Sequence, residues 1–456
     1  MKRQLLVGLF GADDQIEISM GSDEQKTFVQ LIEGKNHLAH GIGSALSYLN
    51  KLGIYPSEVG LDLLILAALV HAADTRISRE QQSQDSWTRE IRLVVPVSDP
   101  EKWNATTPIL KKMLNFLTGD LWEFGFINRP LKFQSLVEQG EGNLVAPSFD
   151  TLSLFSGGLD SLIGAIDLLQ NNNIPLLISH SGDGAASNAQ NQLFSSLKDH
   201  YKENSFARLR VNMNFKEGLV KGVSSDKNTR GRSFLFFTLG VFAGTGFRHQ
   251  FTLRVPENGL IALNVPLDPL RLGSNSTRTT HPYYMARWNE LLQSLDINGK
   301  VLNPYWDQTK GEMVSNCLDK NLLKQLAPDS LSCSSPTKGR WQGLGIEHCG
   351  YCLPCIIRRA ALETALGNDT THYTVFDLHT RELNTLKAEG VQIRSFQYAI
   401  ERLKKQRVLA SVLIHKPGSL ADERKNLDQL ASVYYRGLME VSKLINGVQT
   451  LSLIHI

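Results

Sequence analysis

The chain has 456 residues, of which 42% are hydrophobic and 20% are charged, and its formal net charge at pH 7 is +3. This length predicts two or three domains with large cores, while the small net charge gives no indication of direct nucleic-acid binding. No apolar run is long enough to span a membrane and no cleavable signal is visible at the N-terminus, so we expect a cytoplasmic protein.

Residues 1–145 are predicted to form an N-terminal α+β accessory domain. The apolar runs Leu5–Phe10 and Ile16–Met20, separated by a polar turn, predict a β-hairpin. His71 and Asp74 lie three apart on a predicted buried helix, and we interpret them as a satisfied pair rather than as a site. Apolar spacing predicts helices at residues 42–53, 61–73 and 109–117, of which the second is the buried helix that carries His71. It also predicts a strand at residues 91–97.

A turn-rich boundary at residues 139–148 precedes the most informative stretch of the sequence. Leu152–Phe155 predict a short buried strand, Ser156–Ser161 (SGGLDS) a tight loop, and the apolar spacing from Leu162 onward a helix. The N-terminus of such a helix attracts anions, and adjacent glycines let the backbone approach a ligand closely. We therefore predict an anion site formed by Ser156, Gly157, Gly158, Leu159, Asp160 and Ser161.

Strands and helices alternate after this loop. Strands are predicted at residues 175–180, 207–211 and 259–264, with a long buried helix at 234–242. This alternation predicts an α/β domain over residues 146–368, with a parallel sheet and helices on both of its faces. Ligands of such sheets bind beyond the carboxyl ends of the strands, which is where this pattern places the loop.

Residues 369–456 are predicted to form a helical C-terminal extension. Ser419 begins a predicted capping box, and an apolar stripe over residues 427–445 predicts a long helix that packs on the body or on a partner. The basic cluster Lys404–Arg407 is interpreted as a solvated face. Residues 451–456 resemble the translation of a sequencing-transposon end, so we expect the natural C-terminus to differ.

Four of the five cysteines are close in the sequence, with Cys333 preceding the motif Cys349-Gly-Tyr-Cys352-Leu-Pro-Cys355. Thiolates at this spacing can bind one tetrahedral ion, and four sulfur ligands leave no open coordination position. Cys317 is an alternative to the first of them, and His348 is a further candidate ligand. We predict a structural Zn²⁺ site with Cys333, Cys349, Cys352 and Cys355 as ligands.

Together, the SGGLDS loop and the cysteine motif resemble those of the QueC-type 7-cyano-7-deazaguanine synthases, which are PP-loop ATP pyrophosphatases. Two intervening stretches, Thr229–Leu235 (TRGRSFL) and Thr309–Met313 (TKGEM), also resemble family segments. Long QueC-like chains of this kind resemble the QatC component of Qat anti-phage defence operons. Departures from the family pattern fall at residues 180–185, 233, 257–259 and 281–284, so ATP chemistry is better supported than a free deazaguanine product.

The resemblance implies an ATP-dependent carbon–nitrogen ligase. Such an enzyme adenylates a carboxylate, here 7-carboxy-7-deazaguanine, releases pyrophosphate and transfers the acyl group to ammonia or to the amine of a protein partner from a defence operon. It implies that the loop binds ATP, with His180 and Ser181 near the adenine or the ribose. Asp160 would hold Mg²⁺ or cap the helix, and Lys310 and Arg232 would neutralise charge as pyrophosphate leaves.

Two other functions stay open. A PP-loop enzyme that modifies RNA would need a basic RNA-binding face and usually a reactive cysteine near the loop, whereas no cysteine precedes Cys317. A non-catalytic ATP-binding assembly factor is the second alternative. The presence of Ser156, Asp160 and Lys310 argues against it.

Overall fold

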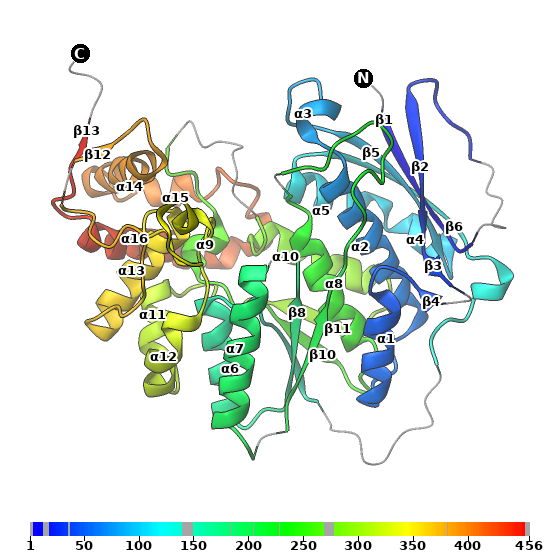
Figure 1. The fold of residues 1–456 in the computed structure, drawn as a ribbon, viewed down its shortest axis with the longest axis horizontal. Helices are drawn as coiled ribbons and strands as arrows, with labels where there is room; N and C mark the ends of the chain where they lie inside the picture. Colours follow the sequence, from blue (N-terminus) through cyan, green and yellow to red (C-terminus); the bar gives the residue numbers. More distant parts are fainter. Residues whose placement is uncertain are drawn as a thin grey trace.

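The computed structural model describes residues 3–11, 18–34, 37–138, 149–182, 184–203, 205–227, 229–268, 278–380 and 382–451. The predicted boundary at residues 139–148 and the tail at 452–456 lie outside these ranges. Two parallel sheets and the helices around them form an α/β fold, with a group of helices at the C-terminal end (Figure 1). No helix in the described ranges combines the length and apolarity needed to cross a bilayer.

The first sheet belongs to the N-terminal region and has the strand order β2-β1-β5-β6. Its strands are β1 (Arg3–Leu9), β2 (Glu24–Gln30), β5 (Glu90–Val97) and β6 (Leu121–Asn128), and all their pairings are parallel. Two further short strands, β3 (Ile32–Glu33) and β4 (His37–Leu38), pair antiparallel. The region is therefore built around a parallel sheet, unlike the predicted α+β arrangement.

The predicted hairpin at the N-terminus is wrong. Strand β1 exists, but β2 and β5 occupy its two edges in parallel register, so neither edge is left for an antiparallel neighbour. Residues 18–20 form no strand, and residues 12–17 lie outside the described ranges. The strand that follows β1 in the described ranges is β2, which pairs with β1 in parallel.

The predicted N-terminal helices and strand are confirmed. Helix α2 is buried along almost its whole length, from Gly60 to Asp74, because it lies in the core that joins the two sheets. Ser57 caps it by accepting a hydrogen bond from the Gly60 N–H at 3.2 Å. The helices of this region are α1 (Ile42–Lys51), α2 (Glu58–Arg76), α3 (Arg79–Gln82), α4 (Pro100–Ala105) and α5 (Thr107–Thr118), followed by the 3₁₀ turn η1 (Leu131–Phe133).

The second sheet has the order β11-β10-β7-β8-β9, and all of its described pairings are parallel. Its strands are β7 (Thr151–Leu154), β8 (Pro175–His180), β9 (Ala207–Val211), β10 (Phe251–Arg254) and β11 (Gly299–Leu302). The strand predicted at residues 259–264 is wrong, because Gly259–Leu263 form helix α9. Asn258 caps that helix by accepting a hydrogen bond from the Ile261 N–H at 3.1 Å. The apolar run by itself does not distinguish a strand from a helix, because it is short.

Helices cover both faces of the second sheet, as predicted (Figure 1). One face shares a continuous core with the N-terminal region, where α8 (Arg232–Gly244) packs on α2 and α10 (Pro282–Ser294) packs on α5. The helices of the other face are α6 (Leu159–Gln170), α7 (Gly184–His200), α11 (Lys310–Asn316), α12 (Lys320–Leu326) and α13 (Leu353–Leu366), with the 3₁₀ turns η3 (Ala327–Asp329) and η4 (Lys338–Gln342) nearby.

The C-terminal extension is helical, and its long apolar stripe is confirmed. Helix α16 buries Leu430, Tyr434 and Leu438 against α9, α13 and α14. The capping box at Ser419 does not form at this helix, since Ser419 accepts from the Ala421 N–H and the helix begins at Leu427. The extension comprises β12 (Leu383–Asn384), α14 (Ala388–Lys405), α15 (Leu409–Leu413), η5 (Ala421–Asn426), α16 (Leu427–Leu444) and β13 (Thr450–Leu451). Residues 404–407 are exposed, as expected.

Candidate functional site

The SGGLDS loop lies at the carboxyl end of β7, the middle strand of the second sheet. Gly157 has φ of +84°, and a Cβ there would lie 3.1 Å from the backbone nitrogen of Gln190, so both the conformation and the close approach favour glycine. Intrahelical bonding in α6 begins with the Leu162 N–H, which donates to Gly158 O at 3.0 Å. The N–H groups of residues 159–161 therefore precede the helical ladder, which is the arrangement that binds anions.

The two loop serines face each other across this turn. Their hydroxyl oxygens are 3.2 Å apart, and the Ser161 hydroxyl donates to Gly158 O at 2.9 Å. The Gly158 N–H donates to the Ser156 hydroxyl at 3.3 Å. The structure therefore brings together the loop residues that the sequence analysis singled out.

A segment far along the chain also contacts the loop. The Leu331 N–H donates to Gly157 O at 2.7 Å, and the Leu159 N–H donates to the Ser332 hydroxyl at 3.2 Å. The sequence analysis missed these two residues, because spacing within a sequence does not show which distant loop packs on a turn. They directly precede Cys333, so the loop and the cysteine cluster share a connecting segment.

Asp160 and Lys310 form a buried ion pair beside the loop. The Lys310 Nζ lies 2.7 Å from Asp160 Oδ1, and their side chains are 3% and 7% exposed. The other carboxylate oxygen accepts from the Asn258 backbone N–H at 3.1 Å and from its side-chain amide at 2.8 Å. Thr309 caps α11 with Glu312 in a capping box, which fixes the start of the helix that presents Lys310.

Glu257 is a third member of this group, and the sequence analysis did not identify it. Burial and the neighbouring Asp160 charge raise the pKa of Glu257 well above its ordinary value. Burial opposes ionisation of Asp160 as well, but Lys310 and the hydrogen bond from Glu257 lower its pKa below the ordinary value. We infer an ionised Asp160 and a protonated Glu257. Placing the fourth strand at β10 rather than at 259–264 would have revealed Glu257 at a carboxyl strand end.

Glu257→Gln is expected to remove a pH-dependent loss of stability. In the unfolded chain Glu257 ionises above about pH 4.5, whereas in the fold it stays protonated to higher pH, so raising the pH favours unfolding by up to about 1.4 kcal/mol per unit. The free energy of unfolding of the variant, relative to the wild type, should therefore rise between about pH 5 and 8. Urea titrations across this range measure it, and a constant difference would contradict a raised pKa.

Arg232, His180 and Ser181 lie on the other side of the loop's strand. His180 ends β8, and the side-chain amide of Gln190 donates to both His180 O and Ser156 O, at 3.3 and 3.2 Å. The Ser181 N–H donates to Val211 O at 2.9 Å, which continues the pairing of β8 with β9. Arg232 is the first residue of α8, and its charge lowers the pKa of the buried His180.

The segment before Arg232 is held by the N-terminal region. The carboxylate of Asp74 on α2 accepts from the Arg230 and Gly231 backbone N–H groups at 2.8 and 2.7 Å. Its other oxygen pairs with Arg79 and Arg89, each at 3.1 Å, within a buried network. Asp74 is therefore satisfied by these groups rather than by His71, so the predicted pairing of the two residues is wrong.

Four cysteines converge into one cluster, with all their sulfur atoms within 4.8 Å of one another. Cys333 Sγ lies 3.9 Å from Cys352 Sγ, and Cys349 Sγ lies 4.0 Å from Cys355 Sγ. The backbone N–H groups of Cys349 and Ser335 each donate to Cys333 Sγ at 3.3 Å, as expected around thiolates. The donor set and its closeness fit a tetrahedral ion such as Zn²⁺.

The positions of Cys317 and His348 exclude them from the cysteine cluster. Cys317 lies in a separate core, where its thiol contacts Asp319 O at 3.7 Å. The His348 ring nitrogen Nε2 accepts from the Ser332 N–H at 3.2 Å, which orients the segment between the loop and the cluster. The four cysteines predicted as ligands are thus the ones that the fold brings together.

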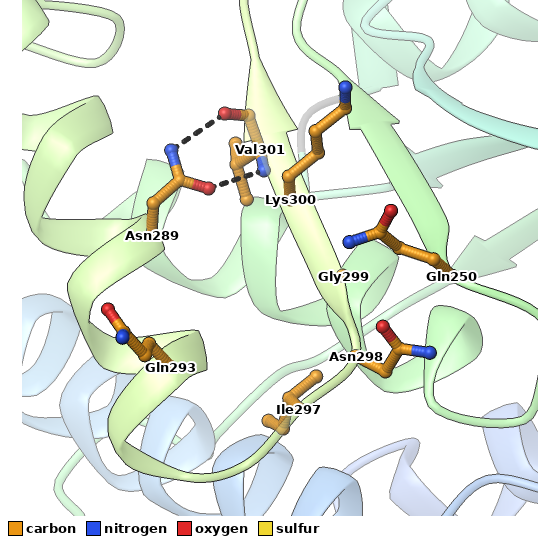
Figure 2. A pocket seen from close by; sticks show the side chains of 8 residues that line it. All are labelled: Gln250, Asn289, Gln293, Ile297, Asn298, Gly299, Lys300 and Val301. Atoms are coloured by element: carbon orange, nitrogen blue, oxygen red, sulfur yellow. Dashed lines mark hydrogen bonds between the residues drawn. The ribbon is translucent and has the colours of Figure 1, made fainter.

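An open pocket of about 480 Å³ lies elsewhere, at the amino ends of β10 and β11 (Figure 2). Asn289 closes one side of it, with its amide bonded to the backbone N–H and carbonyl of Val301 at 2.9 Å. Lys300 is the charged side chain in its lining, which otherwise consists of amide and apolar groups. Because ligands of parallel sheets bind at the opposite edge, this pocket is not the candidate site.

No protein family, curated protein or solved structure matches the chain.

Proposed function

We propose that the protein is an ATP-dependent ligase that adenylates a carboxylate and transfers the acyl group to an amine. The observation that carries this proposal is the glycine turn and helix N-terminus at the end of the central strand, with the buried Lys310–Asp160 pair beside it. The backbone N–H groups of Asp160 and Ser161 at the N-terminus of α6 are the proposed donors to the phosphates, and Lys310, which is paired with Asp160, is the proposed positive charge beside them.

In this proposal the loop orients the phosphates of ATP, and the hydroxyls of Ser156 and Ser161 exchange their bonds within the loop for bonds to the phosphates. A carboxylate oxygen of the acceptor attacks the α-phosphorus, and the bond to the bridging oxygen breaks, releasing pyrophosphate. Lys310 and Arg232 neutralise the charge that develops on the leaving group. An amine then attacks the acyl carbon, loses a proton and displaces AMP.

Asp160 does not offer an open ligand to Mg²⁺ in this structure. One of its oxygens pairs with Lys310 and the other accepts two hydrogen bonds from Asn258. The proposed steps therefore involve no Mg²⁺ held by Asp160. In this proposal Asp160 holds Lys310 in place, and a Zn²⁺ bound by the four cysteines stabilises the segment that contacts the loop.

The acceptor that we propose is 7-carboxy-7-deazaguanine, with ammonia or a protein amine as the nucleophile, within a Qat-type anti-phage defence system. This choice rests on the resemblance of the loop, the cysteine motif and the stretches at residues 229–235 and 309–313 to QueC-type enzymes.

The purified chain is expected to release pyrophosphate from ATP only when 7-carboxy-7-deazaguanine is present. Release without the carboxylate, or stimulation by bulk transfer RNA in its place, would contradict the proposal and favour an RNA-modifying enzyme. ATP binding by calorimetry with no turnover under any of these conditions would instead favour a non-catalytic ATP-binding factor. Mass spectrometry of candidate partner proteins after the reaction would then identify the amine.

A further inference from the structure

Helix α2 brings a histidine of the N-terminal region to the carboxyl edge of the second sheet. The ring of His71 meets the ring of His180 edge-on, with 5.5 Å between their centroids and an interplanar angle of 81°. His71 is 9% exposed and His180 is 2% exposed. Phe215 lies against His71, with 6.3 Å between the ring centroids. Two imidazoles from distant parts of the chain are thus buried together beside the loop.

Three ring nitrogens of this pair have no hydrogen bond of good geometry within the described residues, and the Met213 backbone is only a weak partner of the two rings. They are His71 Nδ1 and both ring nitrogens of His180. Leaving a buried polar atom unpaired costs about 1–3 kcal/mol. Several such atoms are therefore rarely found together in a native fold unless a bound water, ion or ligand pairs with them. The unused hydrogen-bonding capacity points to a ligand that supplies the partners.

The charges around the pair favour an anionic ligand. The pKa of His71 is lowered to about 4 and that of His180 to about 3, chiefly by burial and in part by the Arg232 guanidinium, while a backbone hydrogen bond to Met213 opposes the change in both. Asp74 raises the pKa of His71, and Arg76 lowers it. Both rings are therefore neutral near pH 7, and each can donate one N–H beside the positive charge of Arg232.

The same elements hold this group against the loop. Asp74, one turn after His71 on α2, accepts from the backbone N–H groups of Arg230 and Gly231 and so fixes the start of the helix that carries Arg232. The Gln190 amide joins His180 O to Ser156 O. The histidine pair is therefore attached both to the N-terminal region and to the proposed nucleotide loop.

We propose that His71, His180 and Arg232 form a binding subsite for an oxyanion, so that the N-terminal region completes the site at the edge of the second sheet. This inference rests on the proposed function, because the oxyanion is a carboxylate or phosphate oxygen of one of its reactants. It assigns to the N-terminal region a direct part in ligand binding.

Calorimetric titrations of the full chain test the subsite with ATP, pyrophosphate and 7-carboxy-7-deazaguanine as separate probes. His71→Gln and His180→Asn should each weaken binding of the same probe by about tenfold or more, since a hydrogen bond to a charged group is lost. Weaker binding of ATP and pyrophosphate would assign the subsite to phosphate. Weaker binding of the deazaguanine alone would assign it to the acceptor carboxylate.

His40→Asn is the matched control. His40 also packs on Phe215, with 4.2 Å between the ring centroids, but its ring nitrogens lie 3.2 and 2.9 Å from the backbone carbonyl oxygens of Asn214 and Gln30. Asparagine also tolerates its φ of +56°. This variant is expected to bind all three probes as the wild type does.

The outcomes separate the two proposals. A wild type that binds none of the probes rejects the proposed function, and the subsite with it. A wild type that binds them while both histidine variants bind equally tightly rejects the subsite alone. Histidine-selective ¹⁵N spectra of the wild type need no variant: added probe should shift the resonances of buried neutral imidazoles, and unchanged spectra at saturation would overturn the subsite.

Discussion

Lys310→Met is expected to reduce pyrophosphate release to the level measured without enzyme and also to destabilise the fold. The variant leaves the Asp160 carboxylate buried without its cation, 2.7 Å from where the ammonium lay. Removing one partner of a buried ion pair costs about 3–5 kcal/mol, less whatever protonation of Asp160 recovers. Coupled detection of pyrophosphate and urea unfolding measure the two effects separately.

A double variant distinguishes the catalytic role from the structural one. Asp160→Asn together with Lys310→Met removes both charges, and we expect it to recover most of the lost stability while turnover stays absent. If turnover returned with stability, Lys310 would act only through folding, and its proposed role at the phosphates would be wrong. Asp160→Ala alone is expected to abolish turnover as well.

Arg436→Met provides a control at a second ion pair of α11, since Arg436 lies on α16 and pairs across to α11. Arg436 pairs with Glu312 of α11 at 2.7 Å, but both side chains are more than one third exposed. Exposed pairs contribute at most about 1 kcal/mol, so this variant should change stability little and leave pyrophosphate release unchanged. A large loss of turnover here would indicate that any disturbance of α11 is sufficient.

The local signals in the sequence predicted the parts of the site that are contiguous in the chain. The strand, the glycine turn and the helix from Leu152 onward follow from apolar spacing and from the conformational needs of Gly157, which has a positive φ. The cysteine cluster follows from ligand spacing, because Cys349, Cys352 and Cys355 are separated by only two residues each.

The parts that the sequence did not predict depend on contacts between distant segments. The short apolar run at Gly259 suits a strand or a helix, and the Asn258 cap together with the position of β10 decides for a helix. Because the strand was predicted at residues 259–264, Glu257 was not expected at the carboxyl end of a strand. Helical spacing alone makes Asp74 the neighbour of His71. The packing of α2 on the second sheet instead places His71 against His180.

The parallel pairing of the N-terminal sheet also depends on contacts between distant segments. Local spacing identified β1 and β5 but not their pairing, which is set by the helices between the strands. Parallel pairing requires a crossover, and the buried helix α2 lies between these two strands in sequence. The continuous core that results brings His71 of the N-terminal region against His180 at the carboxyl edge of the second sheet.

Cys355→Ala is expected to release the bound metal and to lower the free energy of unfolding by about 4 kcal/mol or more. A structural metal binds the folded state far more tightly than the unfolded one, so losing a ligand removes part of the folding free energy. Loss of the metal should also disturb the proposed ATP-binding loop, because residues 331 and 332 contact the loop backbone and directly precede Cys333. ATP affinity is therefore expected to fall as well.

Cys317→Ala is the matched control, since it removes a buried thiol of the same kind from a core outside the cluster. It should retain one zinc per chain and bind ATP as the wild type does. Elemental analysis, thermal unfolding and calorimetric ATP titration of both variants make the comparison. A Cys355→Ala protein with one full equivalent of zinc and an unchanged melting temperature would exclude the four-cysteine site, because four sulfur ligands leave no substitute within the described cluster.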